Sequence, residues 1–162
     1  MVYIKSEKQI AAIEKCNKIV AECLQFIEKL IVPDIDTESI NREIENFILQ
    51  KKARPAFKGL YGFPAAACIS INDEVVHGIP GKRKLQSGDI VGIDIGVELD
   101  HFYGDAARTF QVGQVSFELQ KLCKVTRESL YLGIEQCQVG KRIGDISAAI
   151  QNHVERHGYS VV

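Results

Sequence analysis

The sequence has 162 residues, which suits one compact domain, and its 46% hydrophobic and 25% charged content is that of an ordinary globular protein. A net charge of −1 argues against electrostatic binding of nucleic acid or of a membrane surface. We expect no membrane span and no signal peptide, because no apolar run has the required length or position. Five cysteines without a C-x-x-C pair favour reduced thiols in a cytoplasmic protein over disulfides or a cysteine zinc site.

The first third of the chain predicts two helices. Ser6 and Gln9 can form a capping box, and apolar residues then recur on one helical face until Pro33. That face consists of Ile10, Ile13, Val20, Leu24, Ile27 and Ile31. Asp36 or Thr37 can cap a second helix. Its inner stripe consists of Ile40, Ile44, Phe47 and Ile48.

The middle of the chain has the composition of a loop and strands. Residues 54–64 are rich in Gly, Pro and aromatics, which predicts a structured loop. Val, Ile and Phe then dominate four short segments separated by Gly and Pro, as in strands joined by turns. These predicted strands are residues 68–72, 75–77, 89–97 and 101–112.

Helical character returns after the strands. Ser116 can cap one helix and Asp145 another, and Gly158 stands where a helix C-terminus favours a left-handed residue. Residues 159–162 resemble the start of a strand. The order of elements therefore predicts a mixed α/β (α+β) fold in which a second group of strands is missing.

Two aspartates give the most informative pattern. Residues 93–96 read Ile-Asp-Ile-Gly and residues 103–105 read Tyr-Gly-Asp. An antiparallel hairpin with its turn centred between Leu99 and Asp100 would place Asp94 directly opposite Asp105, with Cβ atoms about 5 Å apart. Such a pair of like charges destabilises a hairpin unless a proton is shared or a divalent cation lies between the carboxylates.

Several interpretations of this pair remain open on spacing alone. A pair of metal ions would suit two bridging carboxylates, and oxygen ligands fit Mn, Fe, Co or Zn. A shared proton would instead suit an aspartic-type hydrolase. The turn lacks an Asn-Gly or Asp-Gly signal, so the register could also slip and leave one carboxylate in solvent.

Other candidate functional residues lie on either side of the aspartates. His77 ends an apolar segment beside a Gly-x-Pro turn, where it is either a structural histidine or a group that moves a proton near a metal. The loop at 57–64 is either ordinary core packing or an apolar pocket for an unbranched side chain. His153 and His157 have the spacing of zinc-peptidase ligands but lack the glutamate that follows the first histidine, so we expect both rings to face solvent or to complement the helix dipole.

Three long motifs carry a resemblance to a known family. Residues 68–80 read Cys-Ile-Ser-Ile-Asn-Asp-Glu-Val-Val-His-Gly-Ile-Pro, residues 88–96 and 104–109 contain the two aspartates, and residues 54–64 read Arg-Pro-Ala-Phe-Lys-Gly-Leu-Tyr-Gly-Phe-Pro. Together they resemble type I methionine aminopeptidases along essentially the whole chain. The resemblance implies the pita-bread fold, with two related halves and metal ions between them, and a single catalytic domain over 1–162 that is truncated at its C-terminal side.

The resemblance also implies roles for individual residues. Asp94 and Asp105 would be metal ligands for two divalent ions (Co, Mn, Fe or Zn), and His77 would be the catalytic histidine that contacts the substrate. Four residues would line the pocket for the methionine side chain, namely Phe57, Leu60, Phe63 and Cys68. Leu60 replaces the aromatic residue often found at its position.

The implied function is removal of the N-terminal methionine from nascent proteins, with a polypeptide N-terminus as substrate, the ribosome as a candidate partner, and neither nucleic-acid readout nor a membrane. The family also uses a histidine and two glutamates that have no counterpart here, so we expect little or no activity from this chain alone. The alternative is a non-catalytic pita-bread-like binding module, which would keep the apolar pocket without binding metal.

Overall fold

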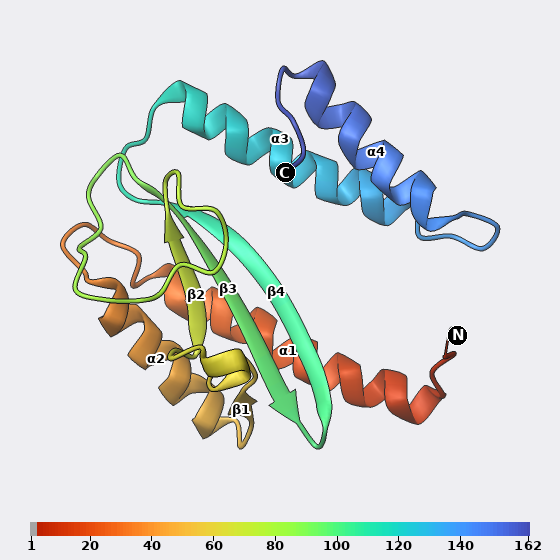
Figure 1. The fold of residues 1–162 in the computed structure, drawn as a ribbon, viewed down its shortest axis with the longest axis horizontal. Coiled ribbons are helices and arrows are strands. Elements are labelled where there is room, and N and C mark those ends of the chain that lie inside the picture. Colours follow the sequence, from red (N-terminus) through yellow and green to blue (C-terminus); the bar gives the residue numbers. More distant parts are fainter. Residues whose placement is uncertain (1–2) are drawn as a thin grey trace. The chain divides into compact units, whose positions relative to one another are not determined.

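Helices come first in the chain, strands follow and helices return (Figure 1). The computed structural model describes residues 3–162, and the chain divides into two units at the junction of Val115 and Ser116. The first unit contains α1 (Glu7–Glu28), α2 (Thr37–Gln50), β1 (Arg54–Pro55), the 3-10 helix η1 (Leu60–Gly62), β2 (Ala67–Ile71), β3 (Ile90–Leu99) and β4 (Phe102–Gln111). The second unit contains α3 (Phe117–Glu135) and α4 (Ile143–Arg156).

Both N-terminal helices begin at the predicted capping residues. Ser6 and Gln9 form the capping box, in which the Gln9 N–H donates to Ser6 Oγ and the Ser6 N–H donates to Gln9 Oε1. At α2 the Ser39 N–H donates to Asp36 Oδ1 at 2.8 Å, so Asp36 rather than Thr37 is the cap. The predicted inner stripes are largely confirmed, although Ile10 is 55% exposed because α1 begins before it reaches the sheet.

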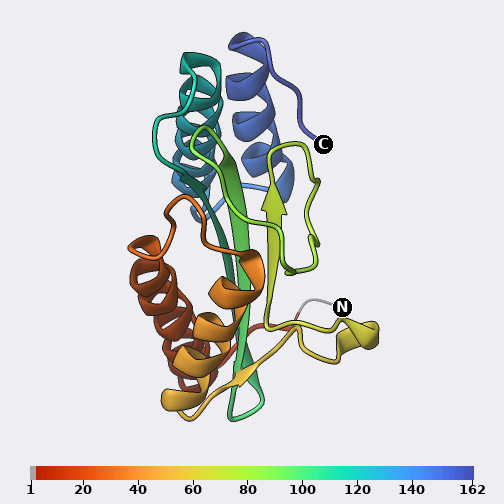
Figure 2. The same cartoon turned by 90° about the vertical axis from the view of Figure 1, so that its left-hand side faces the viewer.

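Strand β3 is the centre of the sheet. β1 and β2 pair with it antiparallel along one edge, and β4 pairs with it antiparallel along the other. Alternate side chains of β3 are fully buried in a core with α1 and α2, which cover one face of the sheet (Figure 2). These core residues of β3 are Val91, Ile93, Ile95 and Val97.

The register of the β3–β4 hairpin differs from the prediction by two residues. Asp94 lies opposite Ala107, and Asp105 lies opposite Gly96. The turn is formed by Asp100 and His101, whose φ values of 52° and 65° are those of a two-residue primed turn. Because side chains alternate with a period of two, a shift of two residues leaves both aspartates on the same face of the sheet.

Two predicted strands are wrong. Residues 75–77 belong to a loop in which Val76 and His77 have φ values of 41° and 38°, a left-handed backbone that cannot continue a strand. Residues 159–162 form no strand. The other predicted strands correspond to β2, β3 and β4 within one or two residues at each end.

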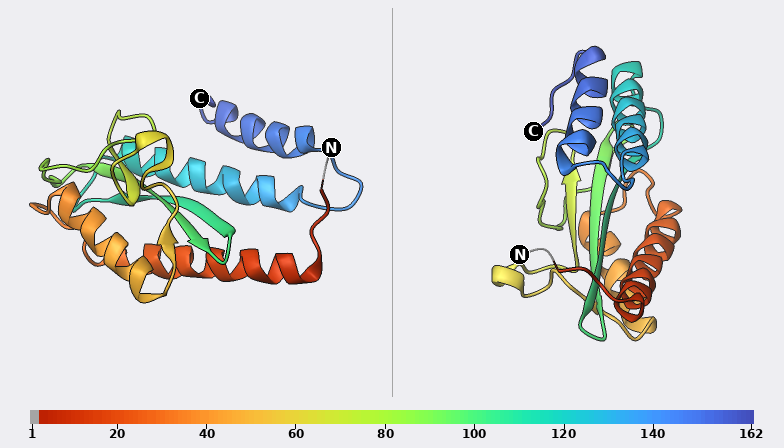
Figure 3. Two further views of the ribbon diagram at one scale, coloured as in Figure 1. Left: turned by 60° about the horizontal axis from the view of Figure 1, so that its bottom comes forward. Right: turned by 90° about the vertical axis from the view of Figure 1, so that its right-hand side faces the viewer.

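The second unit consists of two helices packed side by side (Figure 3). Ser116 caps α3 as predicted, whereas the N-cap of α4 is Arg142, so the prediction that Asp145 caps this helix is wrong. Asp145 is the third residue of α4, and its carboxylate accepts a 2.7 Å hydrogen bond from the Arg142 N–H. No helix within residues 3–162 combines the length and hydropathy of a membrane span.

Candidate metal and substrate site

The candidate site lies on the face of the sheet opposite α1 and α2. Asp94 and Gly96 of β3 project to this face, as do their cross-strand partners Ala107 and Asp105 of β4. The loop that carries η1 lies on the same side of the sheet (Figure 2). One face of the hairpin therefore stabilises the fold, and the other presents two carboxylates.

The carboxyl groups of Asp94 and Asp105 interact although they are diagonal rather than directly opposite. Burial, the charge of Asp105 and a hydrogen bond with Asp105 raise the pKa of Asp94 from 3.8 to about 6, and the nearby His77 opposes this shift. Asp94 Oδ1 is buried and has no hydrogen-bond partner among the described residues. A buried carboxylate oxygen without a partner is costly unless a proton or cation completes it.

This arrangement fits a divalent metal ion. An unpartnered carboxylate oxygen beside a second carboxylate supplies the oxygen ligands that Mn, Fe, Co or Zn accept, and a cation would remove the repulsion between the two charges. Within residues 3–162, however, no group of three or more His, Cys, Asp or Glu side chains is arranged to hold a metal. The two aspartates alone therefore offer a cation two carboxylate side chains.

Cys68 lies next to the aspartates. It is opposite Asp94 in the β2–β3 register and is 6% exposed. Burial and the charges of Asp94 and Asp105 raise the pKa of its thiol, so the thiol stays protonated and apolar. A pocket of about 260 Å³ is lined in part by Cys68, Asp94 and His77, and its lining also includes Thr109 of β4.

A serine of β2 holds the loop that carries His77. Ser70 Oγ donates to the Val76 carbonyl at 2.9 Å and accepts from the Gly78 N–H at 3.1 Å. Gly78 packs so closely on β2 that a Cβ there would lie 2.2 Å from the Ile69 carbonyl oxygen. These contacts fix both neighbours of His77 and maintain its left-handed backbone at the edge of the pocket.

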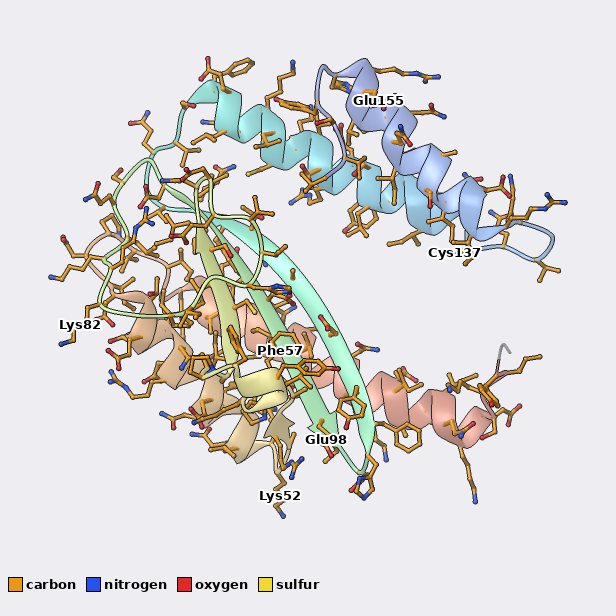
Figure 4. All side chains as sticks on the ribbon, in the orientation of Figure 1. Lys52, Phe57, Lys82, Glu98, Cys137 and Glu155 are labelled. Carbon is orange, nitrogen blue, oxygen red and sulfur yellow. The ribbon has the colours of Figure 1, made fainter. Side chains whose placement is uncertain are left out.

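The predicted pocket residues of the aromatic loop occupy different environments. Phe57 lies against β3, where a Cβ at Gly96 would be 2.4 Å from its ring, and Figure 4 shows its side chain beside η1. Phe63 is half-buried, whereas Leu60 is 53% exposed and Tyr61 is fully exposed. The structure therefore brings Phe57 to the same face as the aspartates but leaves Leu60 largely in solvent.

The pair of histidines on α4 is arranged differently from a zinc-peptidase site. His153 Nε2 lies 3.2 Å from Glu128 Oε2 of α3, and its side chain is only 18% exposed, so this ring does not face solvent. His153 belongs to the last turn of α4, and its expected role toward the helix dipole stays a prediction. His157 is exposed, and its Nδ1 lies 2.9 Å from the His153 carbonyl oxygen. Among the described residues, the lining of a hollow of about 250 Å³ beside His153 includes Asn152 and Arg156 but no carboxylate.

The chain belongs to metallopeptidase family M24, whose sequence profile matches residues 11–162. It is 48% identical over 162 residues to a methionine aminopeptidase of Clostridium perfringens and 42% identical to methionine aminopeptidase 1 of Bacillus subtilis. Each comparison covers 100% of this chain and 65% of the relative. The chain thus spans slightly less than two thirds of the length of these relatives.

Solved structures agree with this assignment. The chain superposes on the methionine aminopeptidase of Rickettsia prowazekii with a TM-score of 0.98 at 42% identity, covering 100% of this chain and 65% of that one. A prolidase of Pyrococcus horikoshii shares the fold, with a TM-score of 0.86 at 23% identity over 96% of this chain and 44% of the prolidase. The predicted α/β pita-bread fold and the resemblance to methionine aminopeptidases are confirmed.

Proposed function

We propose that this chain carries part of the active site of a metal-dependent methionine aminopeptidase, within one catalytic domain that includes both units. The observation that carries the proposal is the Asp94–Asp105 pair, in which a buried carboxylate oxygen has no partner among the described residues. The similarity to methionine aminopeptidases over the whole chain supports the same reaction class. The substrate would be a peptide or nascent polypeptide that begins with methionine.

The proposed ligand roles follow from the site's geometry. Asp94 and Asp105 would hold the two divalent ions, because both carboxylates lie on the same face of the hairpin. The chemistry supplied by the bound ions is activation of water and polarisation of the scissile carbonyl. The chain's own contribution is to keep two carboxylates together against their mutual repulsion.

His77 and the apolar side chains would position the substrate. His77 shares a pocket with Asp94 and can donate a hydrogen bond to a substrate carbonyl or move a proton at its imidazole nitrogens. Cys68 and Phe57 would contact the methionine side chain, with Phe63 and Leu60 at the outer edge of the pocket. Leu60 would have to turn inward when substrate binds, because it is half exposed.

The proposal is tested by metal binding to the 162-residue chain. Mn²⁺ titrated into the chain should broaden the NMR amide signals of Asp94 and Ala107 first, because Mn²⁺ is paramagnetic and binds at the carboxylates. Asp94→Asn and Asp105→Asn should each abolish this selective broadening. Asp100→Asn is the matched control, since it removes the same charge from the turn of the same hairpin and should leave the broadening unchanged. Equal broadening in all four proteins would contradict the proposed site.

We also propose that the 162-residue chain alone has little or no aminopeptidase activity. Two carboxylates hold metal weakly when no further ligands or supporting groups surround it, and the described residues contain no larger ligand group. Release of methionine from a Met-Ala-Ser peptide in the presence of Mn²⁺ or Co²⁺ measures this directly. Turnover that disappears in Asp105→Asn would overturn the proposed inactivity while supporting the site.

A second candidate function is a non-catalytic binding module that retains the apolar pocket. The pocket beside Cys68 and His77 is the observation that favours this alternative. A module would bind a methionine-containing peptide without Mn²⁺ and with equal affinity in Asp94→Asn, whereas an enzyme site would respond to both changes. For either function we propose a cytoplasmic location, and contact with ribosomes remains a separate proposal that a pelleting assay would test.

A further inference from the structure

One turn of α1 packs against β4 on the side of the sheet opposite the candidate site. The thiol of Cys16 is fully buried, and its Sγ lies 3.3 Å from the Phe102 carbonyl oxygen and 3.8 Å from that of Leu99. These are the two residues that flank the hairpin turn. Cys16 therefore ties the closed end of the hairpin to the helix.

The next contact along β4 is a close approach between backbones. A Cβ on Gly104 would lie 2.6 Å from the Asn17 nitrogen and 2.6 Å from the Cys16 carbonyl carbon. Only glycine permits β4 to approach the helix this closely, because rigid backbone atoms cannot move aside as a side-chain tip can. The strand is thus seated on α1 one residue before Asp105.

The third contact reaches Asp105 itself. Asn17 Oδ1 accepts a 3.3 Å hydrogen bond from the Asp105 backbone N–H. β4 pairs with β3 alone in the part of the chain that the structure describes, so a side chain rather than another strand satisfies this amide. The bond joins residues that are 88 positions apart in the sequence.

We propose that Asn17 is a positioning residue, which holds Asp105 beside Asp94 in the geometry that binds metal. This inference rests on the proposed function, because it assigns Asn17 a role toward the metal ligands. Asn17 never touches the metal site, since it acts through the β4 backbone from the opposite side of the sheet. Without its acceptor, the backbone at Asp105 gains freedom, and repulsion between the carboxylates moves them apart.

Two variants at position 17 test this role, one without a hydrogen-bond acceptor in the side chain and one that keeps an acceptor. Asn17→Leu keeps the size of the side chain and raises helix propensity, so it removes the acceptor without weakening the helix. Asn17→Asp keeps an acceptor oxygen in the same place. Gln25→Leu and Gln25→Asp are the matched controls, because Gln25 is also an exposed amide on α1.

The first measurement is hydrogen exchange of the Asp105 amide without metal, and the second is Mn²⁺ affinity from the paramagnetic broadening at Asp94 and Ala107. In Asn17→Leu we expect faster exchange at Asp105 and Mn²⁺ binding weakened about tenfold, as for loss of other groups that orient metal ligands. Asn17→Asp should bind Mn²⁺ at least as tightly as the wild type. Any gain in Mn²⁺ affinity should equal the gain in Gln25→Asp, because both variants add one negative charge to α1. Both Leu variants should keep the thermal unfolding midpoint of the wild type or exceed it.

The outcomes separate this inference from the proposed function. Unchanged Mn²⁺ affinity in Asn17→Leu, with wild-type binding intact, would overturn the positioning role alone. Equal weakening in Asn17→Leu and Gln25→Leu would also overturn it, because the effect would then come from an apolar surface residue. Absence of selective Mn²⁺ broadening in the wild type would overturn the metal site, and the role of Asn17 with it.

Discussion

The two faces of the β3–β4 hairpin are formed by the same strands, but one buries apolar side chains and the other presents two carboxylates. On the core face, Ile93 and Ile95 are fully buried and belong to the apolar core that the sheet forms with α1 and α2. On the other face, Asp94 and Asp105 repel each other, and one carboxylate oxygen lacks a partner. The comparison teaches that burial of one face fixes the register, and the fixed register then holds together charges that would otherwise separate.

The largest effect should come from weakening the face that fixes the register. Ile95→Ala leaves a cavity in the core and should lower the free energy of unfolding by about 2–5 kcal/mol. Thr109→Ala on the exposed face should change it by less than about 0.5 kcal/mol. Urea unfolding followed by circular dichroism measures both. Comparable losses would show that the two faces are not energetically distinct.

Two glycines permit a sharper test, since each stands on a different face. Gly104→Ala forces a methyl group into the α1 backbone and should destabilise the chain by about 1–3 kcal/mol. Gly96→Ala meets the ring of Phe57, which belongs to a loop and can move, so its cost should be smaller. NMR shifts of the Phe57 ring and thermal unfolding distinguish the two results. A greater loss of stability in Gly96→Ala would contradict the assigned contacts.

The stability cost of ionising Asp94, which burial and the charge of Asp105 cause, should depend on pH. Because the folded chain raises the pKa of Asp94 from 3.8 to about 6, the folded state binds the proton more tightly than the unfolded state, and stability is lost as pH rises through this window. In metal-free buffer, Asp94→Asn should be more stable than wild type by about 1 kcal/mol above pH 6, after allowance for solvent screening, and nearly equal to it below pH 4. Unfolding in urea at pH 3.5 and 7.5 tests the sign. A constant difference between these pH values would exclude the raised pKa of Asp94, which burial and the charge of Asp105 produce together.

The smallest effect is expected at the exposed end of the sheet. Arg54 of β1 forms a 2.5 Å ion pair with Glu98 of β3, and the arginine side chain is 76% exposed. Figure 4 shows Glu98 near the closed end of the hairpin. Arg54→Ala should cost no more than about 1 kcal/mol, and the cost should fall in high salt. A larger loss that persists in 1 M NaCl would mean that Arg54 fixes the register as the core face does.

The sequence predicts those features of the fold that have local signals. Ser6, Asp36 and Ser116 mark helix starts because a cap and its partner lie within three residues. The hairpin register has no such signal, since Asp100 and His101 adopt positive φ values without the glycine that usually marks a primed turn. The alternation of side chains along the strands nevertheless places both aspartates on one face, because a register shift of two residues does not change the face on which a side chain lies.

The groups that support the site could not be predicted in this way. Asn17 contacts Asp105 from a helix 88 residues away, and Ser70 contacts a loop for which the sequence predicts a strand. Both bonds join a side chain to a distant backbone group, which leaves no periodic pattern in the sequence. Gly104 is the one signal that could have been used, because a glycine within a strand often marks close approach of another backbone.

The hydroxyl of Ser70 has a further consequence for any molecule that enters the pocket. Its only proton is directed to the Val76 carbonyl, and one lone pair already receives the Gly78 N–H. A bound molecule can therefore donate a hydrogen bond to Ser70. It can accept one from Ser70 only if the hydrogen bond from Ser70 to the Val76 carbonyl breaks. This wall of the pocket should accordingly favour a donor such as a protonated amine over a carbonyl oxygen.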